Sequence, residues 1–155
     1  MKILITFLLL VFSSLVWSFP KVGDFVRFEA HFQGDHYKIE KKVLAYNQDK
    51  DLFKVRTLSL VNNVITQDQS HDLPRNFLYT REKVENVFKT CVSREGALGQ
   101  MRIEDKIIKV CEFYNEDSQL SYMIGEVPFG QVKFQIYLQN EDFLDFNLTR
   151  FVHGE

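Results

Sequence analysis

Apolar and polar side chains alternate along the chain that follows residue 18, and this alternation predicts β-strands with one buried face. In the segment 22–32, four apolar side chains fall on one face: Val26, Phe28, Ala30 and Phe32. Similar alternation over 37–46 and 52–61 predicts two further strands, and a fourth begins at Val64. The pair Asn62-Asn63 predicts a tight hairpin before this fourth strand, because asparagine tolerates positive φ.

A polar loop and a helix are predicted in the middle of the chain. The segment 67–76 is polar and contains Pro74, which predicts a loop rather than a strand. Thr80 can accept a hydrogen bond from the first turn of a helix. The apolar residues that follow have the spacing of one helical stripe: Val84, Val87, Phe88 and Cys91. We therefore expect the single helix of the domain at about 81–95, before Gly96 and Gly99.

Strand signals resume after the predicted helix. Alternation over 100–103 and 106–113 predicts a hairpin around Glu104-Asp105. Three more strands are predicted, at 121–127, 132–139 and 143–152.

Together these elements predict a mainly β (α+β) fold. We expect a curved antiparallel sheet or half-barrel of eight or nine strands with the one helix packed on it. No repeat or linker interrupts 19–155, which indicates a single domain. A helix on one face buries that face without closure of the sheet. The alternative is a closed up-and-down barrel with the helix outside.

Residues 1–18 have the features of a cleaved secretory signal peptide. Lys2 is followed by an apolar run over 3–12, and Ser18 is a small residue at the expected cut before Phe19. The alternative is an uncleaved anchor, but the apolar run is shorter than the roughly 20 residues that a membrane span needs. We therefore expect an exported protein, periplasmic in a Gram-negative cell and otherwise secreted, with no transmembrane span after cleavage.

Two cysteines remain after such a cleavage, Cys91 and Cys111. In an oxidising compartment, two thiols without a third partner are expected to pair, and neither lies in the C-x-x-C spacing of a redox site. The alternative is two free, buried thiols. A bond between them would pin the helix to one face of the sheet.

The mature chain carries little net charge. Removal of 1–18 leaves 137 residues with 18 basic and 21 acidic side chains. A net charge of −3 is too weak a field to indicate nucleic acid or an anionic membrane surface as the partner. The hydrophobic fraction of 45% indicates a soluble globular domain.

No local pattern of residues indicates catalysis or metal binding. The four histidines lack the paired spacing of metal ligands, and we interpret them as solvated surface residues: His31, His36, His71 and His153. The adjacent carboxylates Glu116-Asp117 and Glu141-Asp142 fall in predicted turns, whereas glycosidic chemistry needs two carboxyls across a cleft. The sequence contains no G-x-S-x-G elbow and no phosphate-binding glycine loop. We therefore expect no enzyme activity, no metal and no cofactor.

The most distinctive stretch is GEVPFGQVK at 125–133. Pro128 would stop the pairing of strands, and Gly130 permits an unusual backbone turn. We expect Phe129 between them at the tip of a loop or in the mouth of the sheet. The predicted ligand-binding rim loop consists of Val127, Pro128, Phe129 and Gly130.

The second half of the chain contains Cys91, then a predicted hairpin that carries Cys111, and then a V-P-x-G-x-V-K turn. This half resembles a group of small exported proteins of Gram-negative bacteria that have no assigned function. More distantly, it is similar to the curved, helix-filled half-barrels of periplasmic lipoprotein carriers. Lipocalins are a second candidate for such a barrel, but the mature chain lacks their Gly-x-Trp motif.

The resemblance and the aromatic-rich strands predict an exported, non-enzymatic binding protein that holds a lipid or another hydrophobic ligand in a curved sheet. The alternative is a structural or protein-interaction module of the cell envelope with a solid core. An apolar cavity between helix and sheet would favour the first hypothesis.

Overall fold

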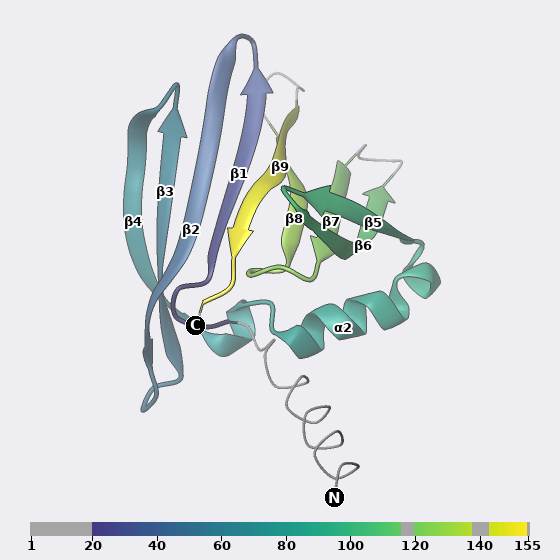
Figure 1. Ribbon diagram of the computed structural model, residues 1–155, viewed down its shortest axis with the longest axis horizontal. Coiled ribbons are helices and arrows are strands. Elements are labelled where there is room, and N and C mark those ends of the chain that lie inside the picture. Colours follow the sequence, from purple (N-terminus) through teal and green to yellow (C-terminus); the bar gives the residue numbers. More distant parts are fainter. Residues whose placement is uncertain (1–19, 116–119, 138–142, 155) are drawn as a thin grey trace, which may run out of the picture.

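The computed structural model describes residues 20–115, 120–137 and 143–154 (Figure 1). The proposed signal peptide, 1–18, and both pairs of adjacent carboxylates lie outside the described residues. In these described ranges nine strands lie in one antiparallel sheet: β1 (Phe25–Phe32), β2 (Asp35–Asn47), β3 (Leu52–Val61), β4 (Val64–Pro74), β5 (Ala97–Ile103), β6 (Lys106–Asn115), β7 (Leu120–Gly125), β8 (Gln131–Tyr137) and β9 (Phe143–Val152).

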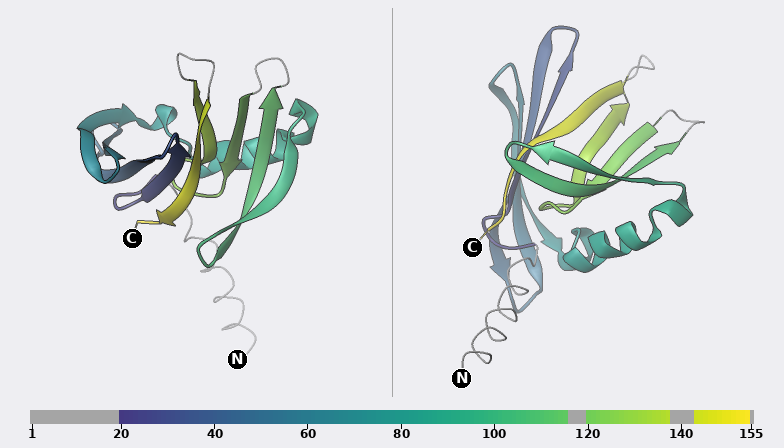
Figure 2. Two further views of the ribbon diagram at one scale, coloured as in Figure 1. Left: turned by 90° about the horizontal axis from the view of Figure 1, so that it is seen from above. Right: turned by 45° about the vertical axis from the view of Figure 1, so that its right-hand side comes forward.

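The strands β1 to β4 follow one another from the centre of the sheet to one edge, and β5 to β9 follow one another from the other edge back to the centre. The strand order is β4-β3-β2-β1-β9-β8-β7-β6-β5, so β1 to β4 form successive hairpins and β9 comes back to pair with β1. The sheet bends strongly, and β5 contacts β9 across the bend (Figure 2). The edge strands β4 and β5 do not pair with each other, so the sheet is open. The predicted half-barrel is confirmed, and the closed-barrel alternative is wrong.

Within the described residues a single α-helix, α2 (Arg81–Thr90), connects β4 to β5 and runs alongside β6 and β7 (Figure 1). The Thr80 side chain accepts a hydrogen bond from the Lys83 backbone N–H at 3.3 Å, as predicted for the helix cap. The α-helical part ends earlier than 95 and is followed by a short 3-10 helix, Val92–Arg94. Glu95 then adopts a positive φ of 62°, which turns the chain toward β5. No helix in the described ranges is long and apolar enough to cross a membrane.

The predicted loop at 67–76 is wrong for most of its length, because β4 continues to Pro74. β4 is an edge strand, so its backbone is paired only with β3. Its side chains from Val64 to Asp72 are exposed, and a strand exposed in this way needs no apolar alternation. Pro74 is its last residue and is followed by the 3-10 helix Arg75–Phe77.

The larger core lies on the inner face of the sheet, which we define as the face that carries Val26 and Phe28 in β1. Buried side chains from both halves of the sheet pack together here: Val26, Phe28, Ala30, Val43, Phe53, Val55, Ile103, Ile108, Val110, Val132, Leu144, Phe146, Leu148 and Phe151. The Phe134 ring stacks on Phe146 at 5.1 Å and meets Phe28 edge-on at 5.0 Å. The part of the inner face where β1, β9 and β8 meet is therefore filled by side chains.

A smaller core lies on the opposite, outer face, under α2. Its buried members come from the helix, β6 and β7: Val84, Phe88, Cys91, Cys111, Phe113 and Ile124. Strand β6 is therefore buried on both faces, because Val110 faces the inner core and its neighbour Cys111 faces the helix. The predicted helical stripe is the surface that packs on the sheet.

Candidate functional site

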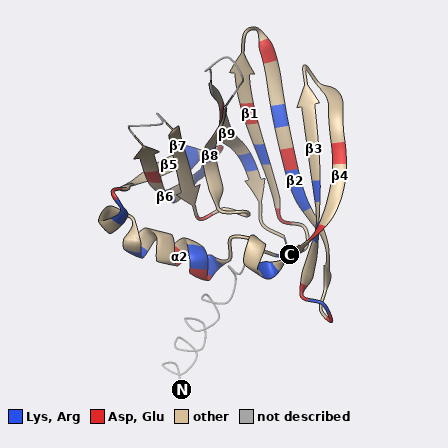
Figure 3. Cartoon of the chain, turned by 180° about the vertical axis from the view of Figure 1, so that it is seen from behind, with Lys and Arg blue, Asp and Glu red and all other residues tan. Residues whose placement is uncertain are grey.

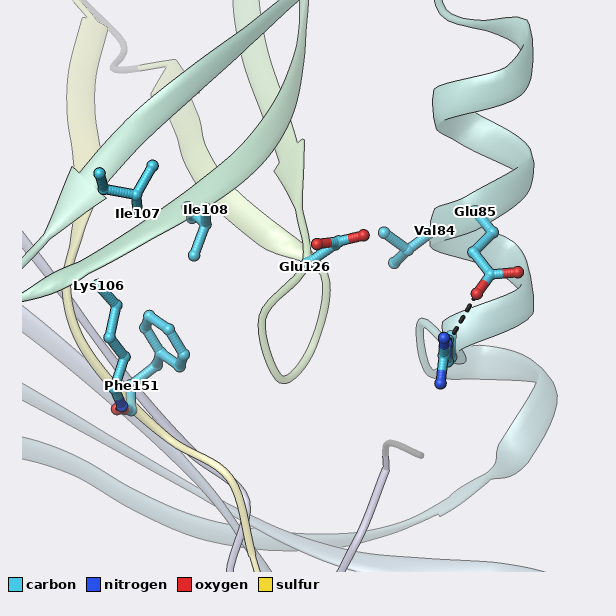
Figure 4. A pocket seen from close by; sticks show the side chains of 8 residues that line it. Val84, Glu85, Lys106, Ile107, Ile108, Glu126 and Phe151 are labelled. Carbon is cyan, nitrogen blue, oxygen red and sulfur yellow. Dashed lines mark hydrogen bonds and ion pairs between the residues drawn. The ribbon is translucent and has the colours of Figure 1, made fainter. Parts of the chain in front are cut away.

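A cavity of about 480 Å³ lies between the first turns of α2 and the sheet (Figure 4). Its walls come from four separate parts of the chain: the helix, the start of β6, the loop between β7 and β8, and the end of β9. The lining residues are Arg81, Val84, Glu85, Lys106, Ile107, Ile108, Glu126 and Phe151. The volume falls in the range of roughly 300–1,000 Å³ that is usual for small-molecule sites.

The interior of the cavity is apolar. Val84, Ile108 and Phe151 are almost fully buried and belong to the two cores, so they form fixed walls. Ile107 is 61% exposed and lies at the mouth. A ligand with an apolar body would remove these walls from water, which is worth about 25 cal/mol per Å² of apolar surface.

Charged side chains surround this apolar interior. Arg81 Nε lies 2.7 Å from Glu85 Oε1, one helical turn further on, so these two charges neutralise each other (Figure 4). The Lys106 ammonium lies 4.5 Å from the centre of the Phe151 ring and 3.5 Å from the Phe151 carbonyl oxygen. Cation–π contact of this kind holds the ammonium at the wall without neutralising its charge.

Glu126 enters the cavity from the opposite side. Figure 4 shows its carboxylate directed toward Val84 across the cavity. Within the described part of the chain the Glu126 side chain makes no hydrogen bond or ion pair, and it is exposed. The walls therefore offer an apolar surface with one unpaired cation, Lys106, and one unpaired carboxylate, Glu126.

The predicted rim loop is placed in the core instead of on the surface. Val127 is fully buried, Phe129 is 9% exposed, and both belong to the inner core; Pro128 and Gly130 are buried as well. The loop reaches the cavity through Glu126 alone, the residue before the predicted set. Ligand binding by Val127, Pro128, Phe129 and Gly130 stays a prediction. Of the two positions expected for Phe129, the free loop tip is wrong, and its burial in the inner core agrees with a ring folded into the sheet.

A tight turn in this loop accounts for the burial of residues 127–130. The Gly130 N–H donates to the Val127 carbonyl at 2.9 Å, and Pro128 occupies the second position of the turn. Phe129 has φ of 64°, at the third position, where a type II turn normally needs glycine. A Cβ atom on Gly130 would lie 2.6 Å from the Tyr79 side chain, so the segment before the helix packs tightly against the turn.

The predicted disulfide is confirmed. Cys91 and Cys111 are bonded, with both residues fully buried in the outer core. No free cysteine is present among the described residues. The bond fixes the end of α2 on β6, whereas the cavity lies at the beginning of the helix. The disulfide therefore does not line the cavity, but it helps to hold in place the helix that forms one of its walls.

His31 and His71 are exposed, as predicted for surface histidines, whereas His36 and His153 are half-buried. His153 is packed edge-on against Phe151 at 5.5 Å, and burial lowers the pKa of its imidazole. His36 Nε2 lies 3.0 Å from a Glu29 carboxylate oxygen. Among the described residues, no three histidine, cysteine or acidic side chains are placed to hold a metal ion.

A buried carboxylate lies next to His153. Asp24 is 1% exposed, and it accepts hydrogen bonds from the Lys21 N–H at 2.7 Å and from the Gly154 N–H at 2.8 Å. Burial raises the pKa of the Asp24 carboxyl, while these two hydrogen bonds and the nearby His153 oppose the shift. Asp24 therefore ties the beginning of the domain to its end and is an internal structural contact.

A second hollow, of about 520 Å³, lies at the hairpin between β2 and β3 and is lined mainly by polar side chains such as Asn47, Asp49 and Lys54. Its walls provide little apolar surface to bury.

The cavity residues were not among the candidates that the sequence indicated. The sequence indicates Val84 only as a core residue and Glu126 only as part of the distinctive stretch 125–133, because the cavity walls come from segments that are distant in the chain. Comparison of the chain with known protein families and with curated proteins found no match.

Proposed function

We propose that this chain is an exported, non-enzymatic binding protein that holds an apolar or amphiphilic small molecule between α2 and the sheet. The observation that carries this proposal is the cavity of about 480 Å³ with apolar walls and a charged rim. A small-molecule site typically combines such an apolar interior with a few polar groups that orient the ligand. The described lining offers carboxylates, an ammonium and a guanidinium, but no hydroxyl, thiol or imidazole that could act as a nucleophile.

Export is supported by the pattern of residues 1–18 and by the disulfide, since disulfides persist in oxidising compartments. In a Gram-negative cell the destination would be the periplasm.

The alternative is a cell-envelope interaction module with a solid core. The filled part of the inner face, where β1, β9 and β8 meet, favours this alternative, because Phe28, Phe134 and Phe146 occupy the room that we expected there for a ligand. The proposed ligand site is therefore beside the helix and not in the centre of the curved sheet.

A neutral fluorescent probe tests the proposal. N-phenyl-1-naphthylamine becomes bright in apolar surroundings, and we expect a saturable rise in its fluorescence with the purified, exported protein. Val84→Phe would fill the cavity and weaken probe binding by about tenfold or more. The matched control is Val87→Phe, which adds the same ring to the same helical stripe outside the cavity lining.

A second variant covers the case in which Val84→Phe disturbs the core. Glu126→Trp places a large side chain in the cavity from an exposed position on the opposite wall, so its fold does not depend on repacking. No saturable fluorescence with the wild type, or equal binding by both cavity variants, would contradict the proposal and favour the solid-core alternative.

A further inference from the structure

Lys41 is a charged residue in an apolar position on the inner face of the sheet. In the registers of β1 and β3 it lies directly across from Val26 and Thr57. Directly opposed residues of antiparallel strands point to the same face, so Lys41 shares the face of Val26, which is fully buried. Val43, two residues along β2 and on the same face, is also fully buried.

The charges next to Lys41 in the sequence point to the opposite face. Glu40 accepts a hydrogen bond from Arg27 Nε at 2.8 Å on the outer face, and Lys42 is exposed there. Figure 3 shows that acidic and basic positions follow one another along β2. The run of charge in β2 is therefore divided between two faces, and only Lys41 is turned toward the core.

No counter-ion accompanies Lys41 within the described residues. Its ammonium makes no hydrogen bond and no ion pair there. Burial alone lowers the pKa of the Lys41 ammonium, and no carboxylate contributes to the shift. The registered same-face neighbours are apolar or neutral: Val26, Ile39, Val43, Val55, Thr57 and Gln69. A lysine in such a place is rare unless it has a partner, because its charge loses hydration and gains nothing in return.

The inner face beyond Lys41 is apolar and only partly covered as far as Phe32, which lies across from Asp35. Ile39 and Tyr37 follow Lys41 along β2 on the same face, and Phe32 lies beside them on β1; all three are half-buried at the margin of the inner core. Lys41 and Tyr37 are four residues apart, which is about 13 Å along a strand. An extended acyl chain of medium length would cover this row.

We propose that the inner face of β1 to β3 binds a medium-chain or long-chain carboxylate, with its head group at Lys41 and its chain along Ile39, Tyr37 and Phe32. A monoanion matches the single ammonium, whereas a phosphate monoester would bring up to two charges to a face with one cation. The contact is a charge-assisted hydrogen bond in apolar surroundings, where such bonds are strong. This site is separate from the cavity beside α2 and does not depend on it.

Titration calorimetry with dodecanoate tests the proposal. We expect Lys41→Met to weaken dodecanoate binding by about tenfold or more and to raise the melting temperature of the free protein, because methionine fills a similar space without a buried charge. Lys42→Met is the matched control: it removes the same charge from the next residue, on the outer face, and should leave dodecanoate binding unchanged. Lys41→Arg keeps the charge and should keep binding.

Two other ligands separate this site from the cavity. Dodecanol has the same chain without the charge, so any binding of dodecanol should be the same for the wild type and Lys41→Met. Dodecyl phosphate should bind more weakly than dodecanoate. Equal dodecanoate binding by the wild type and Lys41→Met, or a lowered melting temperature of Lys41→Met, would overturn the proposal. Neither result would change the binding of N-phenyl-1-naphthylamine in the cavity, on which the proposed function rests.

Discussion

Cys91 at the end of α2 is bonded to Cys111 in β6, and the Cα atoms of the two residues are 6.0 Å apart. The helix otherwise contacts the sheet through a small outer core of few side chains. The disulfide is therefore the firmest link between the helix and the strand that together form two walls of the cavity.

Replacement of both cysteines by serine should lower the free energy of unfolding. The bond closes a loop with a sequence separation of 20 residues, and the chain-entropy model assigns roughly 3 kcal/mol to a loop of this size. Urea unfolding under oxidising conditions measures the difference. A reducing agent should destabilise the wild type and leave the double variant unchanged; equal sensitivity of the two proteins would contradict this account.

Gly96→Ala should be strongly destabilising, because there is no room for a methyl group beside the disulfide. A Cβ atom at Gly96 would lie 2.9 Å from the sulfur atoms of both cysteines. Overpacking of this kind costs about 1–3 kcal/mol. The control is Gly99→Ala in β5, where the added Cβ would meet Val110 at an ordinary 3.7 Å. Thermal melting and a free-thiol assay measure the effect. Equal melting temperatures of the two variants would contradict the tight packing at Gly96.

Phe129 combines a buried ring with a backbone angle that favours glycine, and the two effects can be separated. Phe129→Ala loses the ring, which costs about 3–5 kcal/mol in a core, and keeps a Cβ at φ of 64°. Phe129→Gly loses the same ring but relieves roughly 1–2 kcal/mol of left-handed strain. Urea unfolding should therefore rank wild type above Phe129→Gly, and Phe129→Gly above Phe129→Ala. An alanine variant as stable as the wild type would show that the ring is not part of the core.

The pH dependence of unfolding should change when His153 is replaced by glutamine. Burial lowers the pKa of His153 from its ordinary 6.5, so its contribution to stability is complete above pH 6.5 and is lost as the pH falls through the folded-state pKa. The wild type should therefore lose stability relative to His153→Gln as the pH falls from about 7.5 to about 5. Urea unfolding across this range measures the difference, and a constant difference would contradict the burial of the imidazole.

Asp24 should act with the opposite sign. Its pKa is raised from 3.8 by burial, so its contribution to stability is present below pH 3.8 and is lost as the pH rises through the folded-state pKa. The wild type should lose stability relative to Asp24→Asn as the pH rises from about 3.5 toward neutrality. The same unfolding series tests this prediction. A wild type that becomes more stable relative to Asp24→Asn over this pH range would contradict the raised pKa of Asp24.

The strands and the helix with strong local patterns were predictable from the sequence. Val26, Phe28 and Ala30 alternate as one buried face requires, and the stripe from Val84 to Cys91 is the surface that α2 packs on the sheet. These patterns are readable because burial of one face selects apolar residues at a fixed period. The disulfide followed from cysteine number and the expected oxidising compartment.

Contacts between distant segments decided the rest. Pairing of β9 with β1 joins the two halves of the sheet, and no local period encodes a partner more than a hundred residues away. β4 is stabilised by backbone pairing with β3, so its polar side chains carry no strand signal. The cavity and the apolar surroundings of Lys41 exist only after these segments have packed, because residues such as Val84, Lys106, Glu126 and Phe151 share no local pattern.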